Sequence, residues 1–210
     1  MTRPRRVGDV LRRLPFTLGL LAVVGVLVLV ASGPGFASRP EVVARWGFAL
    51  HKLWEGEVWT VVTATVLLHR PFLFPASALF LAYAVGVYEW AAGTRRALVV
   101  FWTADVVGAL VLALGVVLPL YAAGTALGHE LAFADDVGVS GGAFGCLGAW
   151  MGRLPTRWRG WPPRRLALGA VAVHFAADLF VPGALEANLL HMIVFPLGLW
   201  LDRRLGRPSP

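Results

Sequence analysis

Long apolar runs separated by short polar segments dominate the chain. Six of these runs are long enough to cross about 30 Å of hydrocarbon as helices that rise about 1.5 Å per residue. The predicted spans cover residues 15–33, 72–92, 97–122, 137–153, 165–183 and 187–203. Runs of this length and purity exclude a soluble globular domain and predict an all-α, multi-pass membrane protein.

The longest connection, residues 34–71, separates the first two predicted spans. Its residues include Trp46, His51, Trp54, Glu55, Glu57 and Trp59. Tryptophan side chains gather at the headgroup level of a bilayer. We therefore expect this segment to form a long, semi-buried interfacial loop between helices 1 and 2.

Composition points the same way. The chain has 210 residues, of which 58% are hydrophobic and 15% charged, and a mean hydropathy of +0.70, whereas soluble domains are about 45–50% apolar and about 25% charged. The only cysteine, Cys146, excludes intrachain disulfides and thiol-based metal clusters. We expect one membrane domain at residues 15–204, between a basic N-terminus (1–14) and a short tail (205–210), with no metal and no cofactor.

The net charge of +7 comes mostly from arginines that border the predicted spans. Positive loops stay cytoplasmic, so both termini are expected there, together with the connections that contain Arg95, Arg96, Arg153, Arg157, Arg159, Arg164 and Arg165. Two connections on the opposite side carry acidic residues: Glu130, Asp135, Asp136 and Glu186. This placement favours contact with the lipid bilayer over nucleic acid. We expect an integral protein of a bacterial plasma membrane.

The first predicted span also has features of a signal peptide. Arginines precede it, and the small residues Ala31, Ser32 and Gly33 end it. The run is nevertheless long for a signal peptide, and the chain spans repeatedly afterwards. An uncleaved first helix is the simpler interpretation.

The fourth predicted span begins with closely spaced small residues: Gly138-Val139-Ser140-Gly141-Gly142-Ala143-Phe144-Gly145-Cys146-Leu147-Gly148. Small residues at three- and four-residue intervals let helix backbones approach closely. One interpretation is therefore a packing seam in which Ser140 bonds a neighbouring carbonyl. The other is that Ser140 is a nucleophile.

A histidine, His191, lies about one turn inside the outer end of the sixth predicted span. An ionisable group in an apolar helix is costly and indicates a function, although a simple helix–helix hydrogen bond is the alternative. Because the fourth and sixth spans both begin at the outer side, Ser140 and His191 lie at similar depth. An imidazole can take the proton of a serine hydroxyl near neutral pH.

With these motifs the chain resembles the rhomboid family of intramembrane serine proteases over residues 46–204. The Gly-x-Ser-Gly sequence at 138–141 is similar to the family's nucleophile motif, and His191 stands at its general-base position. The other matches are Phe144, in place of a frequent tyrosine, Gly148, Gly198, the segment 59–69 before the second span, and the turn at 86–96.

The resemblance implies a six-transmembrane-helix rhomboid-like bundle with a Ser140–His191 catalytic dyad. It implies that backbone N–H groups of Val139, Ser140 and Gly141 support the oxyanion. It also implies that four residues pack the dyad: Phe144, Gly145, Gly148 and Gly198. The implied partners are transmembrane proteins, as substrates or clients.

Two features depart from the family pattern. The family commonly places a histidine and an asparagine on the second span to hold the oxyanion, and these positions are Phe74 and Ala78 here. Loss of one such donor costs about 10²–10³ in rate. The family usually has a glycine at the position of Val194, and we expect the valine to lengthen the dyad.

Further polar residues lie in or near the predicted spans. His174 and Asp178 are four residues apart, hence on one helix face, and form a structural pair or a proton-handling site. Asn188 either caps its helix or orients the histidine one turn later. His69 is expected to stabilise the interfacial loop, and the sequence assigns no partner to Asp105.

Three functions are compatible with these residues. The favoured one is a rhomboid-like intramembrane serine protease that cleaves in or next to transmembrane segments. The second is a rhomboid-like pseudoprotease that binds membrane clients without cleaving them, which the departures favour. The third is a small transporter using Asp105, His174 and Asp178, for which neither paired broken helices nor an internal repeat is found.

Overall fold

The computed structural model describes residues 8, 11–33, 39–68, 70–155, 163–178 and 185–206. Within these residues the fold is helical, as predicted, and Phe48 and Asp136 form an antiparallel β-bridge. The bundle helices are α2 (Pro15–Ala31), α6 (Phe74–Ala92), α7 (Thr94–Leu112), α10 (Ser140–Arg153), α11 (Pro163–Asp178) and α12 (Leu185–Arg204).

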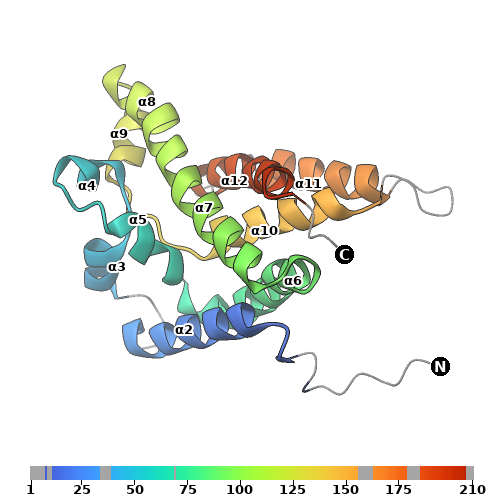
Figure 1. The fold of residues 1–210 in the computed structure, drawn as a ribbon. Helices are drawn as coiled ribbons and strands as arrows, with labels where there is room; N and C mark the ends of the chain where they lie inside the picture. The colour runs from blue at the N-terminus through green and yellow to red at the C-terminus, as the bar shows by residue number, and fades with distance from the viewer. Residues whose placement is uncertain are drawn as a thin grey trace, which may run out of the picture.

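Shorter elements connect the bundle helices. The segment between α2 and α6 forms α3 (Pro40–Trp46), α4 (Leu50–Trp54), α5 (Thr60–Thr63), η2 (Ala64–Val66) and η3 (Pro71–Leu73). A π-helical turn, η4 (Ala113–Val117), joins α7 to α8 (Leu118–Ala122), and α9 (Ala126–Phe133) follows. The short elements gather at one end of the bundle (Figure 1).

Among the described residues, two helical stretches are long and apolar enough to cross a membrane. They are Pro71–Ala92 and the 29-residue stretch Thr94–Ala122, which runs through α7, η4 and α8. Helix α2 is apolar but has 17 residues, and α10 has 14, fewer than the roughly 20 of a perpendicular crossing. The structure therefore supports association with a membrane through these two stretches.

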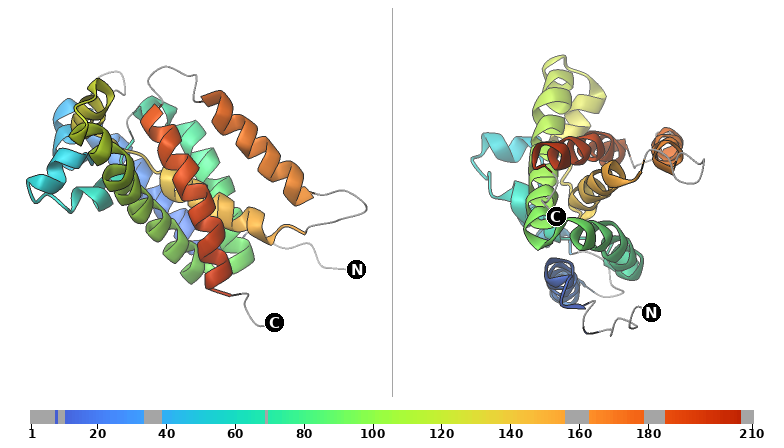
Figure 2. Two further views of the ribbon diagram at one scale, coloured as in Figure 1. Left: turned by 90° about the horizontal axis from the view of Figure 1, so that it is seen from above. Right: turned by 45° about the vertical axis from the view of Figure 1, so that its right-hand side comes forward.

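Helix α10 lies at the centre of the bundle. Helices α12, α7 and α6 all pack against it, whereas α2 packs mainly on α6 and α11 lies at the edge (Figure 2). Every residue of α10 from Gly141 to Ala149 is buried. Its glycines permit this position because they let α7 and α12 approach the α10 backbone.

Helix α7 supplies the surface on which α10 and α12 rest. Its contact stripe recurs at three- and four-residue spacing, so its members share one face: Phe101, Ala104, Asp105 and Gly108. A Cβ added to Gly142 would lie 2.6 Å from the Phe101 ring, and one added to Gly145 would collide with Ala104. The glycines of α10 are therefore matched to the side chains of α7.

A buried glutamate joins α2 to the α6–α7 turn. The carboxylate of Glu89 accepts hydrogen bonds from the backbone N–H groups of Phe16 (3.0 Å) and Thr17 (2.8 Å) and from the hydroxyl of Thr94 (2.8 Å). Helix α2 has no side-chain cap of its own. Glu89 thus satisfies donors that the first turn of a helix leaves without partners.

The segment between α2 and α6 is semi-buried, as predicted. Lys52 is 3% exposed, forms an ion pair with Asp135 (2.5 Å) and donates to the carbonyl of Gly47 (2.8 Å). Phe48 and Asp136 exchange two backbone hydrogen bonds of 2.9 and 2.8 Å. These contacts tie the segment to the chain that leads into α10.

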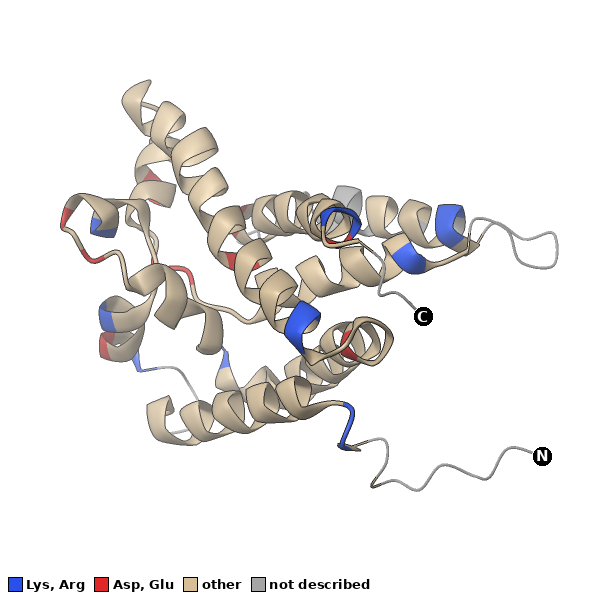
Figure 3. Cartoon of the chain, viewed as in Figure 1, with Lys and Arg blue, Asp and Glu red and all other residues tan. Residues whose placement is uncertain are grey.

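Arginines gather at the other end of the bundle. Figure 3 shows them where α7 begins, α10 ends, α11 begins and α12 ends. There Asp202 of α12 accepts hydrogen bonds from the Tyr88 hydroxyl (2.7 Å) and from Nη2 of Arg153 (2.7 Å). Ser140, the first residue of α10, therefore lies at the opposite end of that helix from the arginines.

Candidate active site

Ser140 opens α10 at a point where the preceding chain is firmly held. The N–H of Gly138 donates to the carbonyl of Ala64 in η2 (3.1 Å), and the first helical hydrogen bond of α10 runs from Ala143 to Val139 (3.3 Å). Val139 has no side-chain acceptor to cap the helix. The serine therefore occupies the first turn, where backbone N–H groups point away from the helix body.

His191 comes from the second turn of α12 and meets this serine. Its Nε2 lies 2.9 Å from Oγ of Ser140, within the roughly 2.6–3.2 Å of a nucleophile–base hydrogen bond. For Nε2 to accept a hydrogen bond from the serine hydroxyl, the neutral imidazole must carry its hydrogen on Nδ1. His191 is 9% exposed. The predicted contact is present, and most of the imidazole is shielded from solvent.

Phe144 packs against the histidine from one turn further along α10. The ring centroids of Phe144 and His191 are 4.1 Å apart at an interplanar angle of 31°. Phe80 of α6 contacts the same phenylalanine, with centroids 5.0 Å apart. Two aromatic rings thus restrict rotation of the imidazole.

Glycines bring α10 and α12 into backbone contact beside the dyad. A Cβ added to Gly198 would collide with the carbonyl of Gly145, and one added to Gly148 would collide with the carbonyl of Phe195. No side chain fits between the helices at either point. The two backbones lie in direct contact there, and this close approach brings the serine and histidine helices together.

The expectation that Val194 lengthens the dyad is wrong. Its side chain is fully buried and faces α7, where a Cβ added to Gly108 would collide with Cγ1 of Val194. The absence of a side chain at Gly108 therefore accommodates the valine. The separation between α10 and α12 is unaffected, and the Ser140–His191 hydrogen bond keeps its ordinary length.

The side chains that replace the family's oxyanion donors have no donor groups. The ring of Phe74 packs on α2, where a Cβ added to Gly25 would lie 3.2 Å from it. Ala78, one turn further along α6, carries only a methyl group. Among the described residues, the N–H groups of Ser140 and Gly141 have no acceptor. They are the donors that remain for a developing oxyanion.

Asp105 is the residue that sequence reasoning left without a role. Its Oδ1 accepts a hydrogen bond from the Gly142 N–H (2.8 Å), and its Oδ2 accepts one from the Thr65 hydroxyl (2.5 Å). A Cβ added to Gly141 would collide with Oδ1. The sequence signal was a lone aspartate in an apolar helix, but its partner could not be read from spacing.

Of the remaining candidate residues, only Asn188 has a described side chain. Asn188 is 4% exposed and lies in the first turn of α12. His69 and the side chains of His174 and Asp178 lie outside the described residues. Among the residues that the structure describes, three or more metal-ligating side chains do not gather anywhere.

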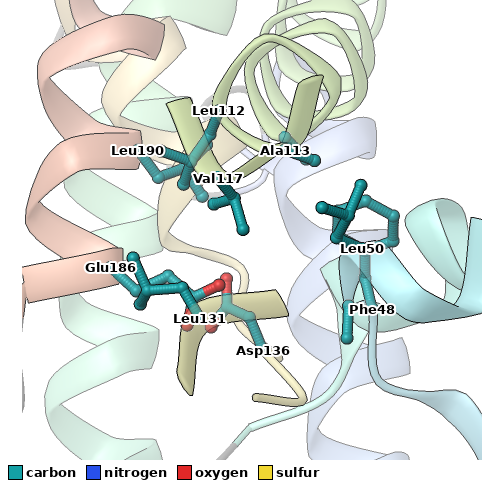
Figure 4. Close-up of a pocket in the computed structure, with 11 residues that line it drawn as sticks. Phe48, Leu50, Leu112, Ala113, Val117, Leu131, Asp136, Glu186 and Leu190 are labelled. Carbon is teal, nitrogen blue, oxygen red and sulfur yellow. The ribbon is translucent and has the colours of Figure 1, made fainter. Parts of the chain in front are cut away.

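A small cavity lies between α7, η4, α9, the start of α12 and the segment at residues 48–50. Its apolar wall includes Leu190, and its polar end is formed by Asp136 and Glu186, whose carboxyl groups point toward one another (Figure 4). Glu186 precedes the apolar part of α12. Burial, with Asp136 and then Asp135 nearby, raises the pKa of Glu186 to about 8.

Comparisons of this chain with protein-family models, curated proteins and solved structures find no match. The residues of the site are therefore the indication of a function. This indication consists of a buried imidazole in hydrogen-bond contact with a serine at the start of a glycine-rich helix.

Proposed function

We propose that this protein is a rhomboid-like intramembrane serine protease that hydrolyses peptide bonds in or next to transmembrane segments of other proteins. The observation that carries the proposal is the 2.9 Å contact between Oγ of Ser140 and Nε2 of His191. A serine hydroxyl becomes an effective nucleophile when a positioned base removes its proton. Packing of Phe144 on the imidazole supports that role.

In the proposed reaction His191 takes the hydroxyl proton while Oγ of Ser140 attacks the substrate carbonyl carbon. The negative oxygen that forms is stabilised by the N–H groups of Ser140 and Gly141, aided by the partial positive charge of the α10 N-terminus. His191 then gives the proton to the leaving amine, and the peptide C–N bond breaks. Water, deprotonated by His191, hydrolyses the acyl-serine ester.

The proposal includes six membrane crossings with both termini in the cytoplasm. The arginines at the ends of α10 and α12 would face the cytoplasm, because positive loops are retained there. Ser140 then lies toward the outer side. The short length of α10 supports this arrangement, since its first residue would lie below the outer surface, at the depth of a substrate helix.

A client-binding protein that does not cleave is the second candidate. The observation that favours it is Phe74, whose ring packs on Gly25 and supplies no hydrogen-bond donor. Two backbone N–H groups would then have to stabilise the oxyanion without the side-chain donors on which the family commonly relies.

Covalent labelling separates the two candidates. Purified full-length protein in detergent is treated with a fluorophosphonate probe, which reacts with activated serines. We expect labelling of wild type, none of Ser140→Ala, and a loss of about 10³-fold or more for His191→Ala. Slow cleavage of a model transmembrane substrate should follow the same order. If neither wild type nor Ser140→Ala is labelled by the probe or cleaves the substrate, client binding is supported instead.

A further inference from the structure

Among the described residues, three buried carboxylates connect helices, and one of them bonds the first turn of α10, which contains the proposed nucleophile. Glu89 holds the start of α2. Asp202 of α12 joins this helix to α6 and α10 by accepting hydrogen bonds from Tyr88 and Arg153. Asp105 of α7 instead bonds the N–H of Gly142, two residues after Ser140. It is 5% exposed.

We propose that Asp105 is a positioning residue that caps α10 from α7 and thereby holds Ser140 in reach of His191. The proposal rests on the function proposed above. Val139, at the capping position of α10, has no acceptor side chain, although residues with a side-chain oxygen are strongly preferred there. The Oδ1 of Asp105 supplies that acceptor from a neighbouring helix.

The surroundings of Asp105 orient the carboxyl group for this contact. The hydroxyl of Thr65, in η2, donates to Oδ2 and leaves Oδ1 directed at the Gly142 N–H. Oδ1 of Asp105 lies against the backbone of Gly141, and a Cβ added to Gly141 would collide with this oxygen. The hydrogen bond from the Gly142 N–H to Asp105 therefore requires a glycine at position 141.

The cap also selects which backbone donors face the substrate. With the Gly142 N–H occupied by Asp105, the N–H groups of Ser140 and Gly141 in the first turn have no acceptor in the part of the chain that the structure describes. A first turn that rotates or frays would displace both donors and Oγ together. A misplacement of about 1 Å in such a group costs about 100-fold in rate.

Four variants of the full-length protein test this role through the rate of fluorophosphonate labelling per folded molecule. Asp105→Leu removes the acceptor and should lower the rate about 10- to 100-fold. Asp105→Asn keeps the acceptor oxygen and should stay within about threefold of wild type. Thr65→Val should lower the rate because the carboxyl loses its orientation, whereas Thr65→Ser should not.

Glu89→Leu is the matched control, because it removes a carboxylate that caps a helix remote from the dyad. It should lower the thermal midpoint and leave the labelling rate of folded protein unchanged. A purely structural Asp105 would behave like this control. An Asp105→Leu variant that reacts as fast as wild type, or an Asp105→Asn variant as slow as Asp105→Leu, would overturn the proposal.

Amide hydrogen exchange of the α10 first turn gives a second readout that needs no activity. The Gly142 N–H should be protected in wild type and Asp105→Asn and should exchange faster in Asp105→Leu. Wild-type protein that does not react with the probe contradicts the proposed function. In that case fast exchange at Gly142 in wild type, or exchange unchanged by Asp105→Leu, still overturns the cap.

Discussion

Val194 of α12 fits against Gly108 of α7, and this pairing permits a bulky residue beside the dyad. The valine side chain occupies the volume in which a Cβ of residue 108 would lie. The α12 backbone therefore stays in contact with α10 at Gly198. The bulk of Val194 on α12 is accommodated by Gly108 on α7.

We therefore expect Gly108→Val to destabilise the bundle and disturb the dyad. The added side chain overpacks the Val194 contact and should cost about 1–3 kcal/mol in unfolding free energy. Labelling of Ser140 by a fluorophosphonate should slow as well. The double variant Gly108→Val/Val194→Gly should recover both properties, and Gly115→Val, where a Cβ meets nothing within 4 Å, is the control.

Gly198→Ala should displace His191 and slow the reaction of Ser140 with the fluorophosphonate probe. Its Cβ would collide with the backbone carbonyl of Gly145, which cannot move aside as a side chain can. Helix α12 must shift away from α10, and His191 moves with it. The measurement is the labelling rate of folded protein. Gly19→Ala on α2, which has open space, should retain the wild-type rate.

Ala78→Asn should raise the rate of substrate cleavage. The asparagine would supply the side-chain donor that the family commonly has at this position, and one such donor is worth about 10²–10³ in rate. The control is Ala78→Leu, which adds bulk without a donor. Cleavage of one model transmembrane substrate is followed for all variants; an unchanged rate for Ala78→Asn would show that a donor at this position cannot reach the oxyanion.

Thermal stability should fall as the pH rises from about 4.5 to about 8 because of Glu186. Burial and the nearby carboxylates Asp136 and Asp135 raise its pKa from 4.5 to about 8 in the folded protein, so folding favours the neutral form. This contribution is fully present below about pH 4.5 and is lost as the pH rises through about 8. The measurement is the thermal midpoint between about pH 5 and 9. In Glu186→Gln the thermal midpoint should decline less with pH than in wild type. An equal decline in the two proteins would contradict the assignment of this effect to Glu186.

The proposed topology places Arg95 and Glu130 on opposite sides of the membrane. Both side chains are exposed, so each can be replaced by cysteine in a Cys146→Ser background and tested with a membrane-impermeant thiol reagent. We expect modification of residue 130 from outside intact cells and of residue 95 only after permeabilisation. Modification of both from the same side would remove the six-span arrangement.

The sequence by itself determined the helical architecture and placed Ser140 and His191 near the starts of two helices. Apolar length predicted the helices, because backbone groups in a bilayer must be paired within the segment. The position of Ser140 at the start of one apolar run and of His191 near the start of another predicted that they could meet. Closely spaced glycines predicted the contact between their helices.

Tertiary structure decided what lies opposite each residue of these helices. Spacing along one helix identifies a face but not the neighbour that covers it, so Val194 was paired in expectation with α10 instead of with Gly108 of α7. The same reason left Asp105 without a partner. Its hydrogen bonds join residues 40 and 37 positions away in sequence, and only packing of α7 against α10 and η2 brings those groups within hydrogen-bond distance.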